Sequence, residues 1–447
     1  MAFVTILAAP AAAHADPGAA AVARAGAVVV GGDDATAIAR NPAGLARRSS
    51  LRLTLGLSLD QRSVTYGSAE SFAAPPPNVE DASDVAIRPW GGAAFGLGDR
   101  IVLGAAILAP TTVDFTDPVP AQAYDAAHDD REAALGRYAG SHLAMSRWAG
   151  GVGAAVRLLP WMAVGAGVLA VRTRVEAART IWAGPSPATR VADLSPDYDV
   201  LVLAAADGWS PMASAGVVVA PPDLPLELAA SVVWRGATSL RGMTAPATSR
   251  GAGPTSTPLA ALAGGTATLD LDAETVLRAG VRILGPRLSA ELDGELDLRG
   301  TATPAFALGG VAVTRPNGEP APLSSLALGP TFAESFALRG AVDVQIVPGT
   351  LALVGGYAVS GAAASATSVT PVAPFTMTQT IAGGVEMRVD TARVTLGLAH
   401  DFRADRTNSP GDARVVAPFV TLDVPAAAGR TSGGATTVAL DVELELL

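Results

Sequence analysis

Hydrophobic and polar positions alternate strictly along several segments of the chain. In residues 51–60 every leucine is followed by a polar or small residue, and residues 288–299 and 438–446 repeat the pattern with acidic residues on the polar side. Successive side chains of a β-strand point to opposite faces, so a period of two predicts strands. Strands of about ten residues with one apolar and one polar face are typical of a transmembrane β-barrel.

The same pattern predicts strands along most of the chain. They cover residues 50–66, 87–97, 100–116, 143–158, 161–178, 209–220, 224–236, 267–284, 288–299, 334–347, 350–360, 378–390, 392–403 and 435–446. The connections alternate between tight turns, such as 98–99 and 348–349, and long stretches such as 117–142 and 300–333. Short turns at one rim, long loops at the other and an even strand count predict an all-β fold, a transmembrane antiparallel β-barrel of about 14 strands. Residues 413–424 look like one more strand and are assigned to a hairpin within the last long loop.

Composition excludes several other classes of protein. Of the 447 residues, 49% are hydrophobic and 16% charged, yet 48 Gly and 33 Pro divide the apolar residues into short runs, so membrane-spanning helices are not expected. The net charge of −10 argues against nucleic-acid binding. Trp90, Trp161, Trp209 and Trp234 lie near predicted strand ends, where membrane barrels carry aromatic girdles.

The chain divides into three parts. Residues 1–15 are apolar and end in an Ala-x-Ala-like site, which predicts a secretory signal peptide without its positively charged start. Residues 16–48 are rich in Gly and Ala and show little alternation, so they are expected to form an N-terminal plug, or hatch. Residues 49–447 are expected to form the barrel.

The plug should contain a short helix. Asp33 and Asp34 can cap a helix over residues 35–40, because carboxylates accept hydrogen bonds from free N–H groups at a helix start. Asn41 precedes Pro42 and should end that helix.

The barrel interior is expected to be partly apolar. Residues 101–110 are apolar on both faces. In 161–177 the even positions, assigned to the lumen, are apolar up to residue 170 and then become Arg172, Arg174 and Glu176. Such strands need either an apolar plug or an apolar passage inside the barrel, and both interpretations remain open.

The N-terminal segment resembles the hatch of the FadL family of outer-membrane transporters for long-chain fatty acids and other hydrophobic compounds. The matching residues are Gly26, Asp33, Asp34, Asn41, Pro42 and Gly44, the last three within Asn-Pro-Ala-Gly-Leu. Residues 99–110, 151–167, 208–210 and 231–235 are similar to strand regions of the family in the right order.

The resemblance implies a 14-stranded barrel that releases its substrate sideways through a kinked third strand. Gly104 and Pro110 lie in the corresponding strand and are the candidates for this opening. In some relatives a basic residue beyond strand five meets the substrate carboxylate, which makes Arg172 and Arg174 candidate ligand contacts. The alternative is that these arginines are solvated or face lipopolysaccharide near the rim.

No catalytic or cofactor site is expected. No His/Cys/Asp cluster has the spacing of a zinc site, and no nucleophile-elbow motif is present. The sequence therefore predicts a monomeric outer-membrane transporter for hydrophobic small molecules, in contact with membrane lipid and lipopolysaccharide. Two alternatives remain: a barrel with a structural or assembly role, and an outer-membrane esterase or phospholipase, for which Ser141-His142 and His400-Asp401 are conceivable elements.

Overall fold

The computed structural model describes most of the chain. The described residues are 18–68, 79–82, 85–116, 138, 142–185, 196–249, 259–299, 304–328, 334–361, 377–408, 419 and 429–446. Within these ranges no helix is long and apolar enough to cross a membrane. The predicted signal peptide and nearly all of the predicted hairpin at 413–424 lie outside the described residues.

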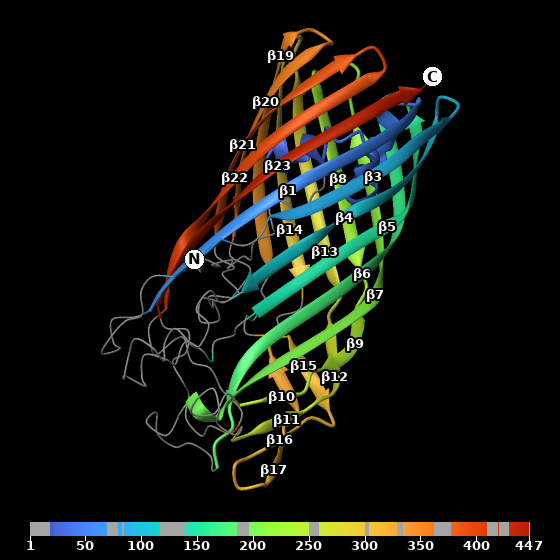
Figure 1. Cartoon of the computed structure of the whole chain (residues 1–447). Helices are drawn as coiled ribbons and strands as arrows, with labels where there is room; N and C mark the ends of the chain where they lie inside the picture. The colour runs from blue at the N-terminus through green and yellow to red at the C-terminus, as the bar shows by residue number, and fades with distance from the viewer. Residues whose placement is uncertain are drawn as a thin grey trace, which may run out of the picture.

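In the described part of the chain, fourteen strands form one closed antiparallel ring (Figure 1). They are β1 (Leu51–Ser68), β3 (Ala86–Leu97), β4 (Ile101–Thr116), β5 (His142–Leu159), β6 (Met162–Trp182), β7 (Asp199–Val219), β8 (Leu226–Arg235), β13 (Glu274–Leu284), β14 (Leu288–Arg299), β19 (Ser335–Val347), β20 (Leu351–Ser360), β21 (Thr378–Val389), β22 (Ala392–Asn408) and β23 (Gly429–Leu446). Each strand pairs with its neighbours in chain order, and β23 closes the ring on β1, from Leu51 opposite Leu446 to Ser68 opposite Gly429. The predicted fold is confirmed. Closure satisfies the backbone of both end strands, as a barrel in lipid requires.

The ring is apolar outside and polar inside. On β14 the side chain of Leu292 is 50% exposed, whereas that of its neighbour Asp293 is completely buried. The same inversion holds for β1 and β23, where leucines are exposed and Thr54, Asp60 and Glu443 are buried. A barrel that buries its carboxylates and exposes its leucines is suited to a lipid environment rather than to water.

β6 faces the opposite way from the sequence-based expectation. Val168 is 61% exposed and Leu169 only 5%, so the odd positions face the lumen and the even positions, including Arg172 and Arg174, face outward. Both faces of this strand are apolar, so the two-residue alternation does not show which face points into the lumen. The small inward residues Gly165 and Gly167 make room for the N-terminal segment.

The aromatic girdle is only partly as predicted. Trp161, Trp209 and Trp234 are exposed on the outer face, but Trp90 is buried and faces inward. The Nε1–H of Trp90 donates a hydrogen bond to Oδ1 of Asp441 at 3.1 Å. A polar partner in the lumen therefore decides the direction of this indole.

Several regions expected to be loops contain strands. The hairpin of β6 and β7 is longer than expected, and β2 (Val79–Ala82) pairs with the end of β1. The predicted strand 267–284 is divided into β12 (Gly265–Leu271) and β13, and β9 (Thr238–Thr244) continues β8 in the same way. The other strands in the regions expected to be long loops are β10 (Ala247–Thr248), β11 (Ala261–Ala263), β15 (Ala305–Gly309), β16 (Ala312–Thr314), β17 (Pro320–Pro322) and β18 (Ser325–Ala327). A short 3₁₀ helix, η5 (Pro196–Tyr198), precedes β7.

The two ends of the barrel differ. Tight turns and the last residues of β23 lie at one rim, while β10, β11, β16 and β17 form a small separate sheet beyond the other (Figure 1). Inside that second rim an aliphatic cluster packs together, with Val175, Val202, Leu240, Leu269 and Phe306 among its buried members. The long-loop end therefore has an apolar core to which β6 and β7 of the ring and the additional strands β9, β12 and β15 contribute.

Candidate functional site

The N-terminal segment, residues 18–50, lies inside the ring near the rim with the tight turns (Figure 1). It contains the short helices α1 (Ala19–Ala23), η1 (Ala35–Ala39) and η2 (Pro42–Arg47). The helix α1 contacts β20 to β23, whereas η1 and η2 contact strands between β3 and β7, so the segment crosses the lumen. Most of its residues are buried.

Local hydrogen bonds fix the two 3₁₀ helices. Oδ1 of Asp34 accepts a hydrogen bond from the N–H of Thr36 at 2.8 Å, which caps η1. Oδ1 of Asn41 accepts one from the N–H of Ala43 at 3.3 Å, and Pro42 stands at the first position of η2, where a missing N–H costs nothing. Asp34 and Asn41 thus have the capping and terminating positions expected from the sequence. Asp33 does not cap the helix and instead forms ion pairs.

Two acidic side chains of the wall hold the backbone of the segment. Oε1 of Glu291 accepts a hydrogen bond from the N–H of Val30 at 2.8 Å, and Oδ2 of Asp293 accepts one from the N–H of Val29 at 2.9 Å. Further along β14, Glu295 pairs with Arg278 and Arg339. The acidic row on β14 therefore serves both to bind the segment and to neutralise arginines of neighbouring strands.

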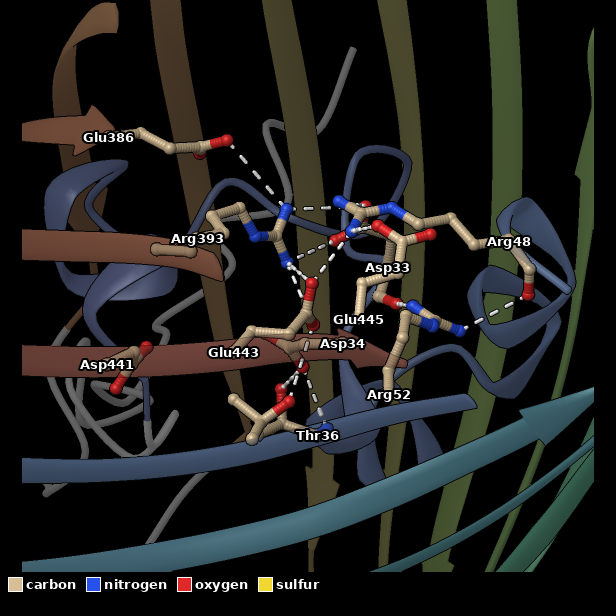
Figure 2. A network of polar contacts seen from close by, with 12 residues as sticks. Asp33, Asp34, Thr36, Arg48, Arg52, Glu386, Arg393, Asp441, Glu443 and Glu445 are labelled. Atoms are coloured by element: carbon tan, nitrogen blue, oxygen red, sulfur yellow. Dashed lines mark hydrogen bonds and ion pairs between the residues drawn. The ribbon is translucent and has the colours of Figure 1, made fainter. Parts of the chain in front are cut away.

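Asp33 is the centre of an ion-pair network between the segment and the wall (Figure 2). Its carboxylate lies 3.0 Å from Nη2 of Arg393 on β22 and 2.5 Å from Nη2 of Arg48. Both arginines also reach Glu443 of β23, at 3.1 and 2.7 Å. Burial alone would raise the pKa of the Asp33 carboxyl, but the guanidinium groups of Arg393 and Arg48 outweigh it and hold this pKa well below its usual range.

Further ion pairs attach both ends of the segment. Nη2 of Arg24 lies 2.9 Å from Oδ1 of Asp343 and 3.6 Å from Oε2 of Glu386. Nη2 of Arg47 lies 2.8 Å from Oε2 of Glu227 on β8. These bridges join one short peptide to strands around the ring, so the segment is fixed to the wall on several sides.

The wall approaches the segment most closely where strands carry glycine. A Cβ on Gly356 of β20 would overlap the backbone of Arg24, and a Cβ on Gly165 would overlap that of Pro42. Within the segment, Gly44 has no room for a side chain against the carbonyl of Gly32. Gly26 has a φ of 84°, in the left-handed region that favours glycine.

Gly104 belongs to this contact as well. It pairs with Ala94 and Gly153, and a Cβ there would stand 3.1 Å from the side chains of Ile38 and Leu45. Gly104 therefore lies opposite the N-terminal segment, in a fully paired stretch of the wall.

Pro110 lies where β3 and β4 part. The pairing of these strands runs from Leu97 opposite Ile101 to Gly91 opposite Ile107. Beyond it, β3 pairs with β1 as far as Ala86 and β4 pairs with β5, but among the described residues these parts of β3 and β4 do not pair with each other. A register shift between Leu108 and Thr111 brackets Pro110, which lacks the N–H needed for the ladder. The wall is therefore interrupted here.

A charged layer separates the N-terminal segment from the aliphatic cluster at the long-loop end. Arg147, Arg235 and Arg299 surround Glu274, with the nearest nitrogens 3.7, 2.5 and 3.3 Å from its carboxylate. On β5, Arg147 lies between Leu143, a member of this aliphatic cluster, and Ala149, which packs against a second apolar cluster that includes Ile38 and Leu45 of the N-terminal segment. Arg235 and Arg299 are the register partners of Glu274 on the neighbouring strands, whereas Arg147 reaches it from β5, a contact that strand pairing does not predict.

Arg172 and Arg174 lie outside the lumen. Arg172 is 53% exposed and its Nη2 lies 3.0 Å from Oδ2 of Asp207, while Arg174 pairs with Glu176. Neither can meet a ligand inside the barrel from this position. Their placement agrees with the alternative of arginines near the rim.

Of the two residue pairs considered for hydrolysis, Ser141 lies outside the described residues and only His400-Asp401 can be placed. His400 is exposed and lies 2.9 Å from Thr436, whereas Asp401 is buried on the opposite face of β22, so this pair cannot act together. Within the same part of the chain no group of three or more His, Cys, Asp or Glu residues could hold a metal ion.

A closed barrel with an apolar exterior and a chain segment fixed in its lumen has the architecture of an outer-membrane channel. No family model and no curated protein matches the sequence. Solved structures do share the fold. A FadL homologue from Pseudomonas aeruginosa is 15% identical, with a TM-score of 0.72 over 96% of this chain and 98% of that chain. The toluene transporters TodX of P. putida (13% identical, TM-score 0.69, 97% and 99% covered) and TbuX of Ralstonia pickettii (13%, 0.64, 97% and 100%) are also similar. The chain therefore has the fold of the FadL-type outer-membrane channels, as its sequence resemblance predicts.

Proposed function

We propose that this protein is a monomeric outer-membrane channel that lets hydrophobic molecules cross without an open water-filled pore. The observation that carries the proposal is the combination of an occupied lumen and an interrupted wall. The N-terminal segment, acting as the hatch, blocks a straight aqueous path, while the end of pairing between Gly91 and Ile107 offers a sideways exit beside Pro110. Such an exit leads into the apolar interior of the membrane. Moving an apolar molecule there from water is favourable by roughly 25 cal/mol per Å² of apolar surface removed from water.

The proteins of similar structure support this proposal, since they include toluene transporters and a monoaromatic hydrocarbon channel. The ring of this chain closes on itself, which is consistent with a monomer. We infer the substrate class as hydrophobic compounds, including long-chain fatty acids.

A disulfide across the wall interruption is expected to stop uptake. If pairing of β3 and β4 continued two residues beyond Gly91 and Ile107, Pro89 would stand opposite Ala109. The double variant Pro89→Cys/Ala109→Cys, in a chain with no cysteine of its own, should bind these strands together once oxidised. Uptake of radiolabelled oleate or toluene by cells lacking the native protein should fall to the level of cells without any copy, and reductant should restore it.

The matched control is Phe95→Cys/Leu103→Cys. These residues already face each other on the outer side of the same two strands, so their disulfide should leave uptake unchanged. Equal uptake by the oxidised and reduced Pro89/Ala109 variant would rule out the sideways exit. A wild-type protein that does not raise uptake at all would favour a structural barrel, and labelling by a serine-reactive fluorophosphonate would favour an esterase.

The charged layer is proposed to meet the polar end of amphipathic cargo. Three arginines face Glu274 and the neighbouring Asp297, which leaves an excess of positive charge in the lumen. Arg147→Leu is therefore expected to slow oleate uptake roughly tenfold, the effect of about 1.4 kcal/mol, and to leave toluene uptake unchanged. An equal effect on both compounds would contradict this role.

A further inference from the structure

The outer face carries an arrangement that transport through the lumen does not use. Trp148 on β5, Arg172 on β6 and Trp209 on β7 are direct neighbours in the strand register. All three are exposed on the outer surface. A tilted strand crosses the hydrocarbon layer in about 9–11 residues, and Arg172 follows Met162, the first residue of β6, by about that length. This row therefore marks the boundary between acyl chains and head groups on the long-loop side.

A groove lies in the wall next to this row. It has a volume of about 430 Å³ and is lined by Val168, Leu169, Ala170, Trp209, Ser210 and Pro211. Pro211 cannot donate to the ladder, and the pairing of β7 with β8 ends at Met212 and Arg235 before it resumes on β9. The register break between β8 and β9 leaves a hollow on the side that faces lipid, with mostly apolar lining.

Cationic side chains stand at the head-group end of the groove. Arg172 and Arg241 both neighbour Asp207, Arg172 through an ion pair and Arg241 as its partner in the register. Arg241 is exposed and makes no ion pair or hydrogen bond with the residues that the structure describes. The ion pair of Arg172 is half exposed, so it contributes little and can exchange for another anion.

Other charges on this face limit what the cations can attract. Arg174, paired with Glu176, lies one outward position beyond Arg172, and Asp270 on β12 is exposed nearby. The face therefore has mixed charge and would not hold a free anion by electrostatics alone. An anion that also carries an acyl chain has the groove as a second point of attachment.

We propose that this face binds a phosphorylated membrane lipid, with an acyl chain in the groove and the phosphate on Arg172 and Arg241. Guanidinium groups bind phosphate through paired N–H donors, and the flanking indoles of Trp148 and Trp209 match the depth of a head group. The site is independent of transport, because none of its exposed side chains faces the lumen.

Native mass spectrometry of the purified protein tests this assignment. The protein is mixed with phosphatidylglycerol, lipid A or diacylglycerol, and the fraction retaining each lipid is measured. The two phosphorylated lipids should be retained and diacylglycerol should not, while millimolar inorganic phosphate should fail to displace them. Equal retention of diacylglycerol, or displacement by phosphate, would overturn the proposal.

Two variants separate the parts of the site. Arg172→Gln/Arg241→Gln should lower retention of phosphorylated lipid at least tenfold, and Ala170→Leu, which fills the groove, should do the same with all arginines present. Arg430→Gln changes an exposed, ion-paired arginine elsewhere on the barrel and should have no effect. All of these positions are exposed, so the folded barrel should persist, which its resistance to unfolding in SDS without heating will verify. Unchanged retention in the double arginine variant would refute the site.

Discussion

Replacing Asp33 with asparagine is expected to admit small hydrophilic solutes to the barrel and to lower the free energy of unfolding by about 3–5 kcal/mol. The change leaves Arg393 and Arg48 without the carboxylate that joins the N-terminal segment to β22. These guanidinium groups lie mostly buried and keep Glu443 as a partner, but their positive charge is then only partly balanced, which costs far more in a buried site than in an exposed one. We therefore expect the segment to leave its place in the lumen.

Swelling of proteoliposomes in solutions of small sugars measures this opening. The control is Asp405→Asn, which removes the exposed partner of Arg430 on the same barrel and should change neither permeability nor stability. If the Asp33→Asn protein were as impermeable and as stable as wild type, the ion-pair network would not be what holds the segment.

Gly356→Val is expected to displace the N-terminal segment by steric overlap alone, with no change of charge. A Cβ at this position meets the backbone of Arg24 and Ala25. That backbone has little freedom to retreat, because Gly26 has a positive φ and Arg24 is paired with Asp343. Overpacking of this kind costs roughly 1–3 kcal/mol or more.

The neighbouring residue provides a matched control. Gly355 lies on the same strand, and a Cβ there meets nothing within 4 Å. Gly355→Val should therefore retain the wild-type temperature for loss of the folded form on an SDS gel, whereas Gly356→Val should lower it clearly. Equal temperatures for the two variants would mean that the segment does not pack against β20 as described.

The sequence predicted the barrel well wherever its two faces differ in chemistry. On β14 the alternation of Leu292 with Asp293 fixes both the strand and its direction, because only one face can meet lipid. On β6 both faces are apolar, so direction depends on what packs inside, and Arg172 was assigned to the wrong face. Trp90 illustrates the same limit, since its direction is decided by Asp441, far away in the sequence.

The sequence predicted the local structure of the N-terminal segment but not its contacts with the strands of the barrel. Asp34 and Asn41 cap helices through residues two positions further on, a pattern that a sequence displays directly. The wall partners of Asp33 and Arg24 lie on β19, β21 and β22, and they depend on how the closed ring brings these strands to the segment. In the charged layer, only the contact of Arg147 with Glu274 depends on closure in the same way, because Arg235 and Arg299 lie on strands that pair directly with β13.

We propose that the N-terminal segment closes the barrel from within, and the conductance of purified wild-type protein in a planar lipid bilayer is the decisive test. A variant lacking residues 18–48 serves as the open reference. We predict that wild type inserts without the conductance steps shown by the deletion variant. Stable steps of equal size in the wild-type protein would mean that the N-terminal segment does not close the lumen.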